Sequence, residues 1–313
     1  MPEVTALAAS YNYCRGLARR AARNFYYGFR LLPPAKRDAL CALYAFMRRA
    51  DDIADDSGAL ETKRANLAAW RAQLDGALAG DPAEHPVWPA LADCVSRYAI
   101  PSRYLHDLIS GTEMDLTETE YATFEKLREY CYRVAGAVGL CCVHVFGFTD
   151  GKAPPLAERL GIAFQLTNIL RDVPRDLAMG RIYLPQDELA RFAVTREALA
   201  ARSASPMLRE FFRFQLERAR QHFREGRHLI PLIHEDSRAA LWALARIYSG
   251  ILDKIAARNY DVLSPPPAGL SAAEKTWTLA RARFGFWPKD EFNQNRAGDG
   301  RRPGGTFLRR RAG

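Results

Sequence analysis

Two stretches of the sequence place carboxylates four residues apart, and the first is RRADDIADD, residues 48–56. On an α-helix, residues at i, i+4, i+7 and i+11 share one stripe. Leu40, Tyr44 and Met47 form an apolar stripe of this kind, and its continuation falls on Asp51 and Asp55. We therefore expect both carboxylates to face inward. Because unpaired buried charge is costly, the pair needs a compensating partner such as a divalent cation. A solvated acidic helix end is the alternative.

The second stretch is FQLTNILRDVPRD, residues 164–176, and it repeats the arrangement. An apolar stripe that should face the core runs through Ile162, Leu166, Ile169 and Val173. The neighbouring stripe carries Gln165, Asn168, Asp172 and Asp176. Two acidic helices of this kind indicate a shared binding chamber much more strongly than either does alone.

Arginines accompany both acidic stretches, Arg48 and Arg49 in the first and Arg171 and Arg175 in the second. Carboxylate and amide oxygens are ligands for Mg²⁺, or for Mn²⁺, and Mg²⁺ takes substrate phosphates as further ligands. Guanidinium groups bind phosphate oxygens in a bidentate manner. Together these residues predict a Mg²⁺ site that binds a diphosphate, where the metal would act as a Lewis acid for the leaving group.

The leaving diphosphate would belong to an apolar ester, because the acidic stripes adjoin apolar ones. The carbocation left behind needs a dry pocket and aromatic faces. Phe25, in NFYYGF, and Tyr44 are candidates for these faces. Aromatic side chains at helical spacing are, however, more often part of an ordinary core.

The elements that would hold these stripes are helices throughout. Apolar residues recur every three or four positions in residues 62–78, 123–146, 153–173, 206–226 and 238–260. Segments rich in proline and glycine, such as LLPPAKR, DPAEHP and SPPPAGL, separate them. We find no alternating strand with a hairpin signal and no Gly-x-Gly-x-x-Gly. The sequence predicts an all-α fold with one catalytic domain, residues 1–285, and a basic, disordered tail, residues 286–313.

Composition limits which binding partners and which cellular compartment we expect. The chain has 313 residues and a net charge of +9, which allows anionic partners. Nucleic acid is not expected, because no zinc spacing or recognition helix accompanies the charge. No stretch has the roughly 18 apolar residues of a membrane span, and the N-terminus lacks the features of a signal peptide. The six cysteines show no C-x-x-C spacing. We expect reduced thiols in a cytoplasmic protein that can associate peripherally with the anionic inner membrane face.

These residues resemble the squalene/phytoene synthase family of head-to-head prenyltransferases. The likeness covers most of residues 20–265 and is carried by the two aspartate motifs together with YCYRVAG and GRIYLP. The resemblance implies a single-domain isoprenoid-synthase helical bundle, all-α, with a central cavity between two Asp-rich helices.

The resemblance also implies roles for individual positions. Metal binding falls on Asp51, Asp55, Asn168, Asp172 and Asp176. Substrate binding falls on Tyr44, Arg48, Gln165, Arg181, Tyr183 and Tyr248. Phe25, already named as a candidate aromatic face, joins them. Catalysis falls on Tyr130, Arg171, Asp51 and Asp172. Of these, Tyr130 would assist departure of the diphosphate.

Two departures from the family pattern bear on the product. Family members often carry Ser-x-Ser-Phe where this chain reads ARNF, with Ala22 and Asn24. The second motif continues as VPRD, which adds positive charge and Pro174. A proline inside a helix removes one backbone hydrogen bond and should kink it, and Asp176 would leave the shared face if the helix ended there. These departures leave the product open, but not the reaction class.

We therefore expect a Mg²⁺-dependent 1′–1 condensation of two farnesyl diphosphates to presqualene diphosphate, with onward conversion to squalene left open. The first alternative is a phytoene synthase that uses two geranylgeranyl diphosphates. NADPH use cannot be read from the sequence. An alternative from a different class is a non-catalytic assembly or scaffold protein of the same fold. The five intact ligand positions argue against that alternative.

Overall fold

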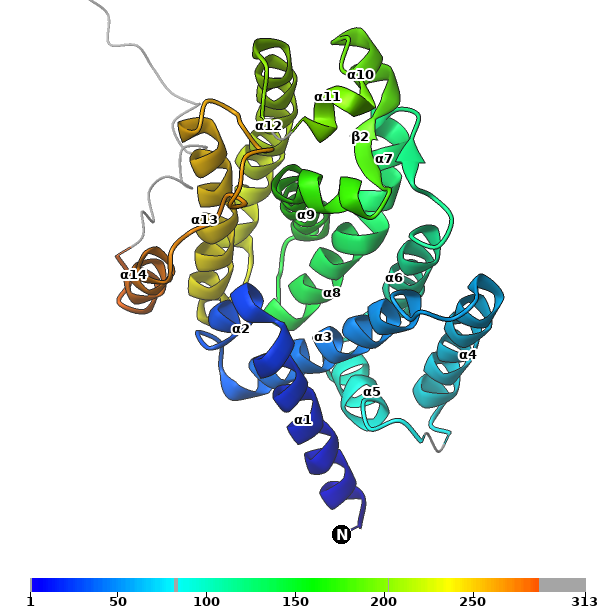
Figure 1. The fold of residues 1–313 in the computed structure, drawn as a ribbon. Coiled ribbons are helices and arrows are strands. Elements are labelled where there is room, and N and C mark those ends of the chain that lie inside the picture. Colours follow the sequence, from blue (N-terminus) through cyan, green and yellow to red (C-terminus); the bar gives the residue numbers. More distant parts are fainter. Residues whose placement is uncertain (1, 82–83, 202, 287–313) are drawn as a thin grey trace, which may run out of the picture.

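The computed structural model describes residues 2–81, 84–201 and 203–286, and it is built almost entirely from helices (Figure 1). The first half contains α1 (Pro2–Ala21), α2 (Arg23–Phe29), α3 (Pro34–Ala54), α4 (Leu60–Ala79), α5 (Trp88–Arg97), α6 (Ser102–Met114) and α7 (Phe124–Cys131). The second half contains α8 (Ala137–Phe146), α9 (Ala153–Ala178), α10 (Gln186–Arg191), α11 (Arg196–Ala200), α12 (Pro206–Gly226), α13 (Glu235–Ala257) and α14 (Ala272–Arg283). The all-α class is thus confirmed. Residues 287–313, nearly all of the predicted tail, lie outside the described residues.

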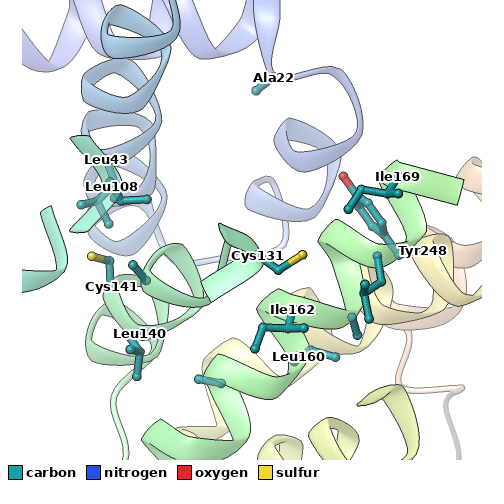
Figure 2. Packing of buried hydrophobic residues seen from close by; sticks show 14 of the residues in the cluster. Ala22, Leu43, Leu108, Cys131, Leu140, Cys141, Leu160, Ile162, Ile169 and Tyr248 are labelled. Carbon is teal, nitrogen blue, oxygen red and sulfur yellow. The ribbon is translucent and has the colours of Figure 1, made fainter. Parts of the chain in front are cut away.

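Helices α3, α6, α8, α9 and α13 pack around the centre, and α1, α5 and α12 cover them from outside. Figure 2 shows Leu43, Leu108 and Cys141 close together where α3, α6 and α8 meet. The four largest fully buried side chains are Trp88, Phe46, Phe211 and Phe212. The buried apolar residues form a cluster that reaches from α1 to α14, so the amphipathic stripes seen in the sequence do face a common core.

Helices α7 and α8 form one continuous helix that contains a π-helical turn, η1 (Tyr132–Gly136). A 3₁₀ turn, η2 (Arg227–Leu232), joins α12 to α13. π-Helical turns are rare and occur frequently at functional sites. Here the turn lies within YCYRVAG, one of the motifs singled out in the sequence.

Two short strands, β1 (Glu120–Tyr121) and β2 (Ile182–Pro185), pair in parallel. Strands of two and four residues are too short to show alternation, and β2 is buried along its whole length. The sequence therefore gave no signal for them. Their pairing brings GRIYLP beside the segment between α6 and α7.

Helix α9 does not end at Pro174 but continues to Ala178. Pro174 lies on the exposed side of the helix, where water can satisfy the carbonyl that loses its intrahelical partner. Asp176 consequently keeps its place on the polar stripe. The concern that this residue would leave the shared face was wrong.

The six cysteines are free thiols, and only Cys142 is not fully buried. This agrees with the reduced thiols that the sequence predicts. Within the described ranges, no helix combines the length and the apolar character needed to cross a bilayer.

Helices α8 and α9 approach so closely that their contact requires glycine. A Cβ atom at Gly139 would overlap the carbonyl oxygen of Ala157, and one at Gly161 would overlap that of Ala135. Both obstacles are backbone atoms, which cannot move aside as a flexible side chain can.

We expect Gly139→Ala to lose about 1–3 kcal/mol of unfolding free energy, because overpacking a rigid contact costs roughly this amount. Gly151→Ala is the matched control, since a Cβ atom there meets nothing within 4 Å. Urea denaturation of both variants measures the difference. Equal midpoints for the two would show that α8 and α9 can separate without cost.

Candidate active site

The two acidic helices meet at a polar chamber of about 320 Å³. Its aspartates come from α3, from the end of α6 and from α9: Asp51, Asp55, Asp115, Asp172 and Asp176. Its arginines are Arg48, Arg171, Arg175 and Arg181. The shared chamber that the two acidic stripes predicted is therefore present, with cationic side chains among the acidic ones.

An apolar cavity of about 310 Å³ adjoins this chamber and shares Arg48, Asp51, Gln165 and Asn168 with it. Phe25 and Phe29 of α2, Tyr44 of α3, Phe164 of α9, and Leu241 and Leu244 of α13 form part of its wall. On α3 the lining runs from Asp51 back to Leu40, which corresponds to a depth of about 16 Å at 1.5 Å per residue. The site thus has a charged end and a deep apolar end.

The stripe on α3 has the predicted orientation. Leu40, Tyr44, Met47 and Asp51 all line the apolar cavity. The helix ends at Ala54, and Asp55 caps it while still lining the chamber. Arg48 forms an ion pair with Asp52 at 2.6 Å.

Both ends of the carboxylate cluster resist ionisation. Desolvation raises the pKa of Asp51 to about 7, Arg48 opposes this rise, and the nearby carboxylates of Asp115 and Asp55 add to it. The Asp51 side chain is open to water in the chamber, but the protein around it limits how well its charge is solvated. Desolvation and the Asp172 carboxylate raise the pKa of Asp176 to about 7. A bound cation would relieve this repulsion.

An unpaired amide oxygen supports the fit to a cation. Oδ1 of Asn168 is buried without a hydrogen-bond partner, while Nδ2 donates to Oε1 of Gln165 at 3.4 Å. Buried polar atoms rarely lack partners, and an amide oxygen is a ligand for hard cations. No three His, Cys, Asp or Glu side chains converge on one point in the described part of the chain. The carboxylate and amide oxygens that line the chamber suit Mg²⁺, which keeps waters and takes phosphate ligands.

Arg171 and Asp172, predicted to contact diphosphate and metal respectively, bind each other here. Nε of Arg171 donates to Oδ1 of Asp172 at 2.8 Å, and Nη2 donates to Oδ2 at 2.5 Å. This bidentate pair compensates the charge of Asp172. The guanidinium lines the chamber, so it remains available to a further anion.

Asp115 is the acidic residue that sequence reasoning missed. Tyr183 Oη donates to its Oδ1 at 2.7 Å, Tyr130 Oη donates to its Oδ2 at 3.2 Å, and Nη2 of Arg181 donates to its backbone carbonyl at 3.1 Å. Desolvation raises the pKa of Asp115, although the two tyrosine hydrogen bonds oppose the rise. The Asp115 carboxylate thus holds Tyr130 and Tyr183 together, and its backbone carbonyl holds Arg181.

A signal for Asp115 did exist in the sequence. Leu108, Thr112 and Asp115 follow the i, i+4, i+7 spacing, and all three line the site. The stripe argument that identified Asp51 would have identified Asp115 as well. Its tyrosine partners could not be found in this way, because β2 brings Tyr183 from 68 residues away.

Tyr130 and Tyr183 stack with ring centroids 5.1 Å apart and planes 17° from parallel. Tyr121 packs against both rings. Burial, followed by the Asp115 charge, raises the pKa of Tyr130 well above its ordinary value. Its hydroxyl therefore stays protonated and able to donate a hydrogen bond into the chamber that it lines.

Tyr248 is the predicted site residue that does not line either space. It is buried, and its ring stacks on Phe164 at 4.5 Å and contacts Phe25 at 5.4 Å. Figure 2 shows its side chain beside Ile169 of α9. Tyr248 therefore supports two aromatic wall residues from behind. The remaining predicted residues line the chamber, the apolar cavity or both.

Comparison with known families finds one that spans most of this chain. The profile of the family described as Squalene/phytoene synthase matches residues 18–276. The chain is 42% identical over 271 residues to the 15-cis-phytoene synthase of Synechococcus elongatus, which covers 83% of this chain and 88% of that protein. It is 42% identical over 248 residues to the phytoene synthase of Mycobacterium tuberculosis, covering 78% and 81% of the two chains.

Two solved structures share the fold. A dehydrosqualene synthase in complex with a ligand superposes with a TM-score of 0.82 at 31% identity, covering 91% of this chain and 99% of that one. The squalene synthase HpnC from Alicyclobacillus acidocaldarius gives a TM-score of 0.76 at 30% identity, covering 83% and 97%. The isoprenoid-synthase helical fold implied by the resemblance is confirmed.

We expect Asp51→Asn to weaken Mg²⁺-dependent binding of pyrophosphate on the order of 10- to 100-fold, because it removes a charged ligand. Without metal, its melting temperature should match or exceed that of the wild type, since the poorly solvated charge is gone. Titration calorimetry and thermal melting measure the two effects.

Asp56→Asn is the matched control. Asp56 is exposed, and its Oδ1 accepts a hydrogen bond from the Gly58 backbone, a bond that an asparagine oxygen can keep. Equal pyrophosphate affinities for the two variants would remove Asp51 from the metal site.

Proposed function

This chain belongs to the squalene/phytoene synthase family, and within that family we propose that it joins two geranylgeranyl diphosphates head to head to form phytoene. The coarser activity, head-to-head condensation of prenyl diphosphates, follows from membership. The observation that carries the finer assignment is the 42% identity to proteins named phytoene synthase over about four fifths of the chain.

This assignment revises the first expectation from the sequence, which favoured two farnesyl diphosphates. The relatives named phytoene synthase are 37–42% identical, whereas the solved structures named for dehydrosqualene and squalene synthesis are 30–31% identical. The closer resemblance supports the longer substrate. Squalene-type synthesis remains the second candidate because of those two structures.

The charged end of the site suits two diphosphates. Arg48, Arg171, Arg175 and Arg181 line it, and guanidinium groups bind phosphate oxygens in a bidentate manner. Asp51, Asp55, Asn168, Asp172 and Asp176 are the proposed ligands for Mg²⁺, which when bound supplies Lewis-acid stabilisation of the leaving diphosphate. The arginines orient the same group from other sides of the chamber.

Tyr130 is placed to donate to the departing diphosphate. Its bond to Asp115 is long, at 3.2 Å, so a phosphate oxygen that gains negative charge is a competitive acceptor for the same proton. A donor aimed at developing charge stabilises the transition state more than the ground state. Asp115 orients the hydroxyl before the substrate arrives.

The apolar end suits the prenyl chains and the cation. Rings of Phe25, Tyr44 and Phe164 are part of its wall, and aromatic faces attract a cation electrostatically. A cavity of largely apolar lining also excludes water, which would otherwise capture the cation. The alternative of a non-catalytic scaffold protein is less well supported, because both the proposed metal ligands and the apolar pocket are intact.

The balance of the reaction separates the two candidates. Two geranylgeranyl diphosphates lose two diphosphates and two protons to give phytoene, as two carbon–oxygen and two carbon–hydrogen bonds break and a double bond joins the two chains. No electrons enter or leave. Squalene formation instead loses two diphosphates and one proton and requires a hydride, which NADPH supplies. Dependence on NADPH thus distinguishes squalene formation from phytoene formation, and the C40 or C30 mass of the product distinguishes phytoene from dehydrosqualene.

Purified protein with Mg²⁺ and geranylgeranyl diphosphate, without NADPH, should release a C40 hydrocarbon with the mass of phytoene. A sample containing EDTA should release none, because Mg²⁺ is removed. Farnesyl diphosphate with NADPH is offered in parallel, and mass spectrometry of the extracted lipid names the product. A C30 product alone would assign the squalene branch, and no product from either substrate would favour the scaffold alternative.

Tyr130→Phe should lower turnover on the order of 10²–10³-fold, the usual loss for one transition-state donor. Its melting temperature should fall only slightly, since the ring and its stacking are kept. Tyr121→Phe is the control from the same stack, because the Tyr121 hydroxyl is buried without a partner. Single-turnover rates decide. Equal rates for both variants would place the Tyr130 hydroxyl in the core and not in the chemistry.

A further inference from the structure

Helix α14 and the turn after it expose three large aromatic side chains. Trp277 is 66% exposed, Phe284 is 72% exposed and Phe286 is 69% exposed, the three highest values among large apolar residues in the described ranges. Single exposed apolar residues are ordinary, but a group of them within ten residues marks an interaction surface. Trp277 and Phe284 are seven residues apart and so lie on the same side of the helix axis.

The helix that carries these rings is firmly attached. A capping box between Ser271 and Glu274 fixes its start, and Lys254 of α13 pairs with Glu274 at 2.6 Å. Near its other end, the Arg281 guanidinium lies 5.8 Å from the ring centroid of Trp242 on α13. Thr278 and Ala282 are buried beneath it. The aromatic side is therefore presented outward by a held helix.

Basic charge lies near the aromatic side chains. Arg283 is exposed at the end of the helix, and no described residue forms an ion pair with it, whereas the Arg281 guanidinium lies against Trp242 and donates to the Phe286 carbonyl. The sequence that follows, residues 287–313, contains seven basic and three acidic residues. Aromatic side chains among lysine and arginine are the pattern of helices that lie in the interface of an anionic membrane.

The surface also lies outside the wall of the apolar cavity. Leu241 and Leu244 of α13 line that cavity, and Gly28 of α2 packs against Leu244. Helix α14 covers the outer side of α13, away from α8 and α9 (Figure 1). A lipid surface against α14 would thus be separated from the cavity by one helix layer.

We propose that α14 docks the protein on an anionic lipid bilayer, with Trp277 and Phe284 inserted at the level of the headgroups and the basic side chains paired with lipid phosphates. A second copy of this chain is a poorer occupant, because the net charge around the rings would repel its own image across a two-fold interface. The inference goes beyond the proposed reaction and does not depend on its substrate.

Flotation of the full chain with vesicles tests the proposal. Vesicles of phosphatidylcholine with phosphatidylglycerol should bind it, and binding should weaken as salt screens the charges. Trp277→Gln/Phe284→Gln should lower the partition coefficient on the order of 10- to 100-fold, because two rings no longer bury apolar surface. Trp277→Phe, which keeps an aromatic ring, should retain most of the binding.

The control carries Leu60→Gln and Met207→Gln, two exposed apolar residues on α4 and α12, and should bind as the wild type does. Melting temperature and turnover on detergent-dispersed substrate should be unchanged in both double variants, so loss of docking is distinguished from loss of the reaction. Wild-type partition by the α14 variant overturns the proposal. So does equal binding to pure phosphatidylcholine, or a loss of dimers in size-exclusion chromatography without any change in flotation.

Discussion

Five carboxylates line one chamber in which water cannot fully solvate them. Many of the neighbouring side chains compensate this unfavourable charge. Asp51 and Asp176 show the cost, since the pKa of each carboxyl is raised to about 7. Partial compensation comes from within the protein, through the Arg171–Asp172 pair and the tyrosines on Asp115. A cation and its phosphate ligands would supply the rest. We therefore expect such a site to bind charged partners strongly, because its carboxylates otherwise repel one another.

Helix packing keeps this unfavourable cluster from spreading apart. The backbone of α9 touches α8 at Gly139 and η1 at Gly161, so the polar stripe of α9 is fixed relative to the continuous helix that carries Tyr130. Asn168 shows the result: its amide oxygen stays buried without a partner. A more loosely packed pair of helices would let this atom reach water. The rigid packing of these helices thus keeps the unpaired Asn168 oxygen in its unfavourable position.

The sequence predicted what is local and periodic. The stripes through Asp51 and Asp172 gave the fold class and one shared chamber, because a helix places residues by spacing alone. Residues brought together by chain topology were beyond that argument, and Asp115 with Tyr183 is the clearest case. Tyr248 was assigned to the site by resemblance, yet its ring lies behind Phe164. Ala22, read as a departure that bears on the product, is buried outside the cavity lining, so it does not shape the pocket directly.

The π-helical turn at Tyr132–Gly136 has a consequence for helical phase. Tyr130, Val134, Val138, Cys142 and Phe146 all line the site, at a constant spacing of four. In a regular α-helix each such step drifts by about 40°, so the last side chain would point about 160° away from the first. The π-helical turn contains about one residue more than an α-helical turn, which reduces this angular drift by roughly 100°. One helix can therefore border a long molecule from its charged head to the tip of its tail. A one-residue insertion or deletion here would turn the two ends of the site away from each other, even with every lining residue still present.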